Sequence, residues 1–143
     1  MRELFVRDPD AAFVRELIQC QVKFMLIGGY AVKAYLPARE AKDLDVLVEP
    51  TVKNVQRMIA ALANLKIAAD FSAEVLACRN KRIPINFPTQ YDIDLLTPTD
   101  DTDFDLIYER SETVKVNSIE VWGVPHSLDR KMASLRWIVA PAF

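Results

Sequence analysis

The chain has 143 residues, of which 51% are hydrophobic and 27% are charged, and its formal net charge is −2. This length and composition predict a single folded domain over residues 1–143 and exclude a disordered tail. The slightly negative charge excludes a general nucleic-acid-binding protein, because such proteins need a broad positive surface.

The N-terminal stretch MRELFVRDPD mixes arginines with acidic residues and has no continuous apolar run. It therefore predicts neither a signal peptide nor a membrane anchor, and we expect a cytoplasmic protein with no membrane contact. Cys20 and Cys78 stand far apart, which fits neither a zinc ligand set nor a disulfide framework. We expect both thiols to have no functional role.

The first part of the chain is predicted to contain a helix, a strand, a glycine turn, a short helix and a second strand. Asp8 and Pro9 predict a helix start with Asp8 as the N-cap, and an apolar stripe carries this helix to near Gln21. The following elements are predicted as a strand over 23–27 ended by Gly28-Gly29, a helix over 30–36 and a strand over 43–50.

The second part begins with an amphipathic helix from Thr51 to Leu65, whose predicted buried face is Val52, Val55, Ile59 and Leu62. The later elements are predicted as a helix near 72–78, strands over 82–87 and 91–96 joined by a turn at 88–90, a helix within 100–111, a hairpin over 113–124 and a helix over 127–139. This order predicts an α/β (α+β) fold, with a small mixed sheet, helices packed on one face and an acidic site on the other.

Two of the predicted strands carry pairs of aspartates. In DLDVLVEP, Asp43 and Asp45 are two residues apart, so both carboxylates are expected on one face of the strand. In YDIDLL, Asp92 and Asp94 repeat the pattern. Buried carboxylates need a positive partner, and hard oxygen ligands at this spacing suit magnesium. If the two strands are close, their carboxylates form the ligand inventory of a two-metal phosphoryl-transfer site.

Gly28-Gly29 supplies a second ingredient of such a site. A strand that ends in two glycines and turns into a helix exposes backbone N–H groups where no Cβ hinders a phosphate. A tight turn with no ligand is the alternative interpretation of the same two residues. The order strand, Gly-Gly, helix and Asp-x-Asp strand favours the phosphate site.

At this point the residues resemble a known family. LIGGYAV followed by REAKDLDVLV is similar to the nucleotidyltransferase superfamily with the DNA polymerase β-like fold, and among its members to small bacterial AbiEii-toxin-related and minimal nucleotidyltransferases. The stretch from DIDLLTPTD to the predicted last helix is also similar, so the resemblance covers roughly residues 24–137. It implies a cytoplasmic enzyme that uses two Mg²⁺ ions and an NTP.

The resemblance assigns roles by position. It implies that Asp43, Asp45 and Asp94 are the metal ligands and catalytic carboxylates, and that Gly28 and Gly29 form the phosphate-binding turn. Further nucleotide contacts are implied for Arg39, ahead of the acids, and for Lys131, in the predicted last helix. The implied acceptor is a hydroxyl of RNA such as tRNA, of a protein or of a small molecule. A cognate toxin or antitoxin partner or a homodimer is also implied.

Several alternatives stay open. Asp43 and Asp45 can instead form ion pairs with Lys42 and Arg39 on an edge strand. Asp92 competes with Asp94 as third ligand, and Lys131 is either a phosphate contact or a solvated helix position. The family threonine is Ala41 here, and no separate acceptor-binding domain is seen in the sequence. These departures leave a non-catalytic nucleotide-binding or antitoxin-like protein as the rival to an enzyme, and a plain interaction module as a third possibility.

Overall fold

The computed structural model of the protein describes residues 2–35, 38, 40–87, 93–110, 112–116 and 134–137. Within these residues the helices are α1 (Asp8–Gln19), α2 (Gly28–Tyr35), α3 (Val52–Asn64), α4 (Ala73–Leu76) and α5 (Phe104–Arg110). The strands there are β1 (Arg2–Leu4), β2 (Phe24–Ile27), β3 (Leu44–Val48), β4 (Arg82–Ile85), β5 (Ile93–Leu96), β6 (Glu112–Val116) and β7 (Ser134–Trp137). Of the described helices, none is long and apolar enough to cross a membrane.

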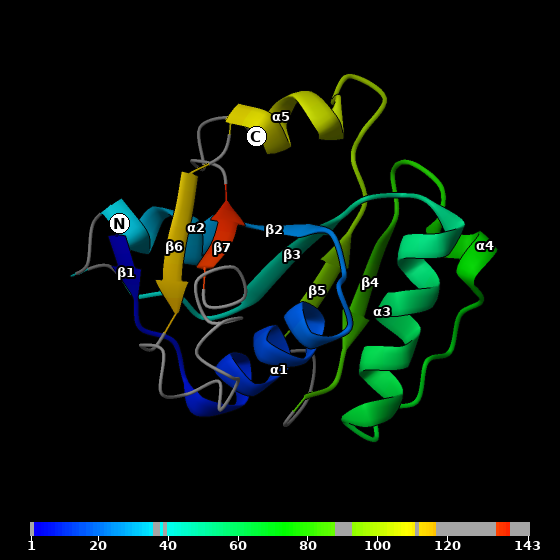
Figure 1. The fold of residues 1–143 in the computed structure, drawn as a ribbon, viewed down its shortest axis with the longest axis horizontal. Helices are drawn as coiled ribbons and strands as arrows, with labels where there is room; N and C mark the ends of the chain where they lie inside the picture. Colours follow the sequence, from blue (N-terminus) through cyan, green and yellow to red (C-terminus); the bar gives the residue numbers. More distant parts are fainter. Residues whose placement is uncertain are drawn as a thin grey trace.

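The strands form one mixed sheet in the order β1-β6-β7-β2-β3-β5-β4 (Figure 1). At its centre β2 and β3 are antiparallel neighbours, and β5 lies parallel to β3. The edge strand β4 is antiparallel to β5, as expected for the predicted pair over 82–87 and 91–96. The described fold therefore belongs to the predicted mixed α/β class.

Helix α1 begins at Asp8, but its N-cap is the preceding residue. Arg7 is extended and makes no side-chain cap hydrogen bond, so the prediction of Asp8 as the N-cap is wrong by one residue. Pro9 lies in the first turn, where its missing N–H removes no intrahelical hydrogen bond. The helix ends two residues before the expected Gln21, which has a positive φ of 59° that helical residues do not adopt.

Helix α3 is capped by Thr51, whose Oγ1 accepts a hydrogen bond from the Asn54 backbone N–H at 3.2 Å. Its buried residues are Asn54, Val55, Met58, Ala61 and Leu62. Val52 was predicted to face the core but is 41% exposed. Because two residues turn a helix by about 200°, Val52 and Asn54 cannot both face inward, and Asn54 takes the inner position.

The larger hydrophobic core lies on one face of the sheet, where α1 and α3 pack (Figure 1). Alternate residues of the central strands point into it: Phe24 and Leu26 of β2, Leu44, Val46 and Val48 of β3, and Ile93 and Leu95 of β5. The residues between them must therefore point to the opposite face. Asp45 lies between Leu44 and Val46, so it is on the opposite face, as the spacing of the aspartates predicts.

The opposite face carries a smaller core under α5. Phe104, the first residue of α5, is 4% exposed and packs in one cluster with Met25, Ile27 and Leu47. Helix α5 therefore covers part of the face on which the sequence places the acidic site. The remaining part of that face, toward β5 and β4, carries the aspartates.

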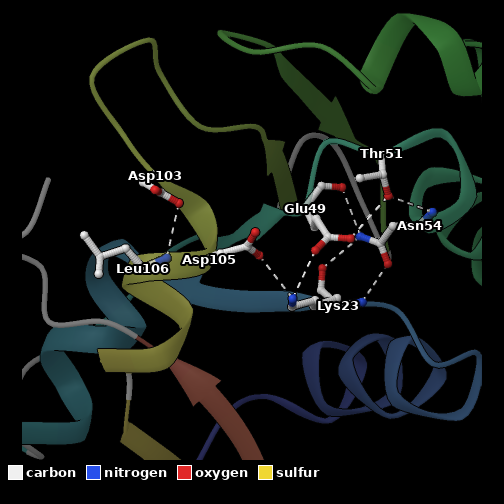
Figure 2. A network of polar contacts seen from close by, with 7 residues as sticks. All are labelled: Lys23, Glu49, Thr51, Asn54, Asp103, Asp105 and Leu106. Atoms are coloured by element: carbon white, nitrogen blue, oxygen red, sulfur yellow. Dashed lines mark hydrogen bonds and ion pairs between the residues drawn. The ribbon is translucent and has the colours of Figure 1, made fainter.

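A polar network fixes α3 and α5 to the central strands (Figure 2). Asn54, 2% exposed, accepts a hydrogen bond from the Lys23 N–H at 2.7 Å and donates to the carbonyls of Lys23 and Glu49 at 2.9 and 3.1 Å. The Lys23 ammonium forms ion pairs with Glu49 at 3.1 Å and with Asp105 of α5 at 3.2 Å. Lys23 thus connects the start of β2, the end of β3 and α5.

The C-terminal region differs from its prediction. Residues 134–137 belong to the helix predicted over 127–139, yet they form strand β7, antiparallel to β6 and parallel to β2. The expected helix is therefore wrong over these residues, because hydrogen-bonding partners on both sides outweigh a local helical pattern. The N-terminal strand β1, which pairs in parallel with β6, was not predicted.

Candidate functional site

Asp45 and Asp94 lie side by side on neighbouring strands. Strands β3 and β5 pair in parallel with Asp45 opposite Asp94. The residues before and after each aspartate point into the larger core, so both aspartates point to the other face. Asp43 directly precedes β3 and is exposed. The proximity of the two acidic strands, on which the predicted site depends, is present in the structure.

The turn into α2 lies directly against Asp45. The last residue of β2, Ile27, pairs with Asp45, so Gly28 follows at the same level of the sheet. Gly28 has a φ of +70°, a left-handed conformation that glycine adopts without a steric penalty. A Cβ at this position would also collide with Oδ2 of Asp45. The backbone conformation and the close carboxylate both require glycine here.

Gly29 contacts the segment that leads to Asp43. A Cβ built on Gly29 would lie 3.4 Å from the Cβ of Ala41, which is close to ordinary van der Waals contact. The two glycines therefore differ: Gly28 packs against the acidic strand, and Gly29 packs against the segment that holds Ala41. A side chain larger than alanine at position 41 would reduce the space between this segment and Gly29.

A buried carboxylate connects α1, α2 and the segment before Asp43. Asp10 is 0% exposed, and its Oδ2 accepts hydrogen bonds from the Tyr30 hydroxyl at 2.8 Å and from Arg7 Nε at 3.1 Å. Arg7 also donates to the Lys42 carbonyl at 3.1 Å. Burial, followed by the hydrogen bond to Asp10, raises the pKa of Tyr30 to about 12. These contacts hold the first turns of α1 and α2 beside the acidic patch, which consists of Asp43, Asp45 and Asp94.

Asp45 is held in an unfavourable environment for a negative charge. Burial is the largest cause that raises its pKa, to about 6, and the charges of Asp94 and Asp43 act in the same direction, whereas Arg82 opposes them. Its Oδ1 is buried and has no hydrogen-bond partner among the described residues. An ionised carboxylate in this position is costly unless a cation or a hydrogen-bond donor reaches it.

Arg82 of β4 supplies a positive charge on this face, and the sequence reasoning missed it. Its Nη2 lies 2.5 Å from Oδ2 of Asp94, and the hydrogen bond and charge of Asp94 raise the pKa of the guanidinium. The register puts Pro84 opposite Asp94, so Arg82, two residues away, shares the face of the aspartates. The sequence predicted that 82–87 pairs with 91–96 but not the register of the pair, which decides that Arg82 meets Asp94.

The carboxylate oxygens of Asp45 and Asp94 are suitable ligands for a hard divalent cation, but they do not form a complete coordination sphere. Carboxylate oxygens are the ligands that Mg²⁺ prefers, and the buried Asp45 Oδ1 lacks a partner among the described residues. Within the same residues, no group of three or more His, Cys, Asp or Glu side chains is placed to hold a metal ion. Arg82 occupies an Asp94 oxygen that a cation at this place would need.

The structure does not test the other predicted site residues. Arg39, Asp92 and Lys131 lie outside the described residues. Among the residues that are described, Asp94 forms an ion pair with Arg82, and Lys42 forms none with Asp43 or Asp45. The alternative of a pairing with Lys42 is therefore not observed, and the choice between Asp92 and Asp94 stays a prediction.

A separate pocket of about 620 Å³ lies between the end of α3, α4 and β4. Its lining combines apolar side chains, with Phe71, Val75 and Phe87 among the larger ones, with the polar side chains of Lys66, Asp70 and Asn86. None of the aspartates of the sheet face lines it. Asp70 is the only acid among the described residues of its lining, so the metal-dependent chemistry implied by the sequence does not belong there.

Comparisons of the chain with protein-family models, with curated proteins and with solved structures found no match. The functional interpretation therefore depends on the residues and contacts of this chain. The decisive ones are the Asp45–Asp94 pair, the turn at Gly28 and the Arg82 guanidinium.

Proposed function

We propose that the protein is a metal-dependent nucleotidyltransferase that moves an NMP from an NTP to an acceptor hydroxyl. One observation carries the proposal: Asp45 lies beside Asp94, while its other side packs against Gly28 at the start of α2. A carboxylate pair and a glycine turn that allows close backbone approach are therefore in direct contact. The family resemblance implies the same combination.

In this proposal different residues bind the metal ions, bind the phosphates and activate the acceptor. Two bound Mg²⁺ ions would neutralise the triphosphate and polarise the bond that breaks. Asp43, Asp45 and Asp94 hold them through carboxylate oxygens, and the Gly28 turn lets the N–H groups at the start of α2 reach phosphate oxygens. Asp94 also orients the acceptor hydroxyl and accepts its proton. The acceptor oxygen bonds to the α-phosphorus as pyrophosphate leaves.

The test is transfer from each labelled NTP, with Mg²⁺, to total cellular RNA and protein. We expect label in one acceptor class and release of pyrophosphate, both abolished by chelation and by Asp45→Asn. Asp101→Asn is the matched control, because Asp101 is an exposed acid outside the site. If no NTP raises the melting temperature in the presence of Mg²⁺ and none releases pyrophosphate, the proposal is wrong.

A second candidate is a nucleotide-binding or antitoxin-like protein without turnover. The observation that favours it is the Arg82–Asp94 ion pair, which occupies the carboxylate proposed to activate the acceptor. Ala41 in place of the family threonine points the same way. Under this candidate Mg–NTP binds and raises the melting temperature, but no pyrophosphate appears with RNA, with protein or with a cognate partner.

A further inference from the structure

We infer that Arg82 is an exchangeable counterion of the candidate site. In the free protein it neutralises Asp94; when a divalent cation binds the carboxylates, Arg82 leaves Asp94 and binds a phosphate oxygen of the triphosphate. This inference rests on the proposed function and adds a residue that neither the sequence motif nor the family resemblance assigns. It makes one side chain both a competitor of the metal and a ligand of the substrate.

The Asp94 carboxylate is held within the sheet, whereas most of the Arg82 side chain lies in solvent. Asp94 is 13% exposed and receives the guanidinium at 2.5 Å, whereas the side chain of Arg82 is 67% exposed. Arg82 begins β4, which ends the strand order of the sheet. The guanidinium can therefore rotate into solvent without disturbing a packed core, while the Asp94 carboxylate stays where the strand holds it.

The charges of the patch favour this exchange. Asp94, Asp45 and Asp43 all act electrostatically on Arg82. With all groups ionised, three carboxylates and one guanidinium leave 3 − 1 = 2 negative charges without a partner among these residues. A divalent cation bound to the carboxylates neutralises the negative charge that attracts Arg82. Its positive charge also repels the guanidinium. A triphosphate then offers pairs of oxygens that the planar guanidinium can bind with two parallel hydrogen bonds, which an ammonium cannot do.

A purely structural ion pair makes a different prediction. If Arg82 only stabilises the pairing of β4 with β5, its removal loosens these strands and lowers the affinities for Mn²⁺ and for triphosphate together. An exchangeable counterion moves two affinities in opposite directions, because its loss removes a competitor of the cation and a ligand of the phosphate. A rise in cation affinity together with a fall in phosphate affinity therefore distinguishes an exchangeable counterion from a structural ion pair.

The experiment measures Mn²⁺ binding by electron paramagnetic resonance, and then binding of inorganic triphosphate at saturating Mn²⁺, in the full chain. Arg82→Gln is expected to bind Mn²⁺ about fivefold more tightly, since an exposed ion pair no longer competes. It is expected to bind triphosphate about tenfold more weakly, since a charge-assisted hydrogen bond is lost. Lys81→Gln is the matched control: it removes the same charge from the exposed neighbouring residue and should change both affinities by less than about twofold.

Arg82→Lys keeps the charge and guards against a folding defect, which thermal unfolding of each variant also monitors. It should hold Mn²⁺ affinity near that of the wild type while weakening triphosphate binding, because an ammonium cannot form the bidentate contact. Mn²⁺ affinity that is unchanged or lower in a folded Arg82→Gln protein overturns the inference but leaves the proposed function standing. A wild-type protein that binds no Mn²⁺ dependent on Asp45 overturns the proposed function as well.

Discussion

Replacing Asp45 with asparagine should stabilise the protein in the absence of metal. The pKa of Asp45 is raised from 3.8 to about 6, so its ionised form is disfavoured in the folded state. A difference of about two pKa units corresponds to about 3 kcal/mol at neutral pH. Because the side chain is only partly buried, solvent screening reduces this to about 1–2 kcal/mol. For a chain of this length the melting temperature should rise by about 3–6 °C.

The effect has a defined dependence on pH. The folded-state pKa of Asp45 lies above the unfolded value, so the folded state binds its proton more tightly between about pH 4 and pH 6. Raising the pH through this window removes that proton and lowers the stability of the wild type. Above pH 6 the wild type carries the full penalty, and below pH 4 it carries none. Asparagine does not titrate, so the advantage of the variant should grow across the same window.

The assay is thermal unfolding followed by circular dichroism from pH 4 to pH 8 with a chelator present. Asp101→Asn removes one exposed acid and controls for the change in net charge. An electrostatic cost at Asp45 is refuted if Asp45→Asn melts at or below the wild-type temperature at pH 7, or if its advantage is the same at pH 4 and pH 7. The first result would mean that Asp45 has a stabilising partner, as in the ion-pair alternative, and the second would mean that the gain in stability does not come from the ionisation of Asp45.

Three further predictions concern stability measured by urea unfolding. Gly28→Ala should lose about 2 kcal/mol or more, because it combines a left-handed φ with a collision, whereas Gly29→Ala should change stability by less than about 1 kcal/mol; equal losses would contradict this difference. Asn54→Ala should lose about 1–3 kcal/mol, because it leaves the backbone N–H of Lys23, directly before β2, without its acceptor, and no measurable loss would show that water replaces the side chain. Tyr30→Phe should lose about 1–2 kcal/mol by removing a donor to Asp10, and unchanged stability would count against this hydrogen bond.

Much of the sheet could be predicted because its signals are local. The apolar run 24–27 and the alternation around Asp45 define β2 and β3 without knowledge of the rest of the chain. The helix after Thr51 follows from a cap and an apolar stripe. The shared face of the aspartates follows from strand geometry alone. For these elements local pattern and tertiary packing favour the same structure.

The remaining features depend on partners distant in sequence. Residues 134–137 form a strand because β2 and β6 lie on either side of them, and no local pattern reveals those neighbours. Asn54 is buried because the backbone of Lys23 needs its amide. Arg82 joins the site through the register of β4 against β5, which a sequence pattern does not fix. The cation of the patch was therefore missed although its strand was predicted.

Two carboxylates of this chain have a buried oxygen without a hydrogen-bond partner among the described residues, and their surroundings distinguish them. Asp10 is wholly buried, but its other oxygen accepts hydrogen bonds from Tyr30 and Arg7, which tie it to two elements of the fold. Asp45 packs against Gly28, and burial, followed by the charges of its acidic neighbours, raises its pKa. The first arrangement stabilises the folded protein, whereas the second opposes folding at neutral pH. A group that costs stability and lies against a turn open to phosphate is better explained by a ligand than by packing, and this asymmetry supports assigning the proposed chemistry to Asp45.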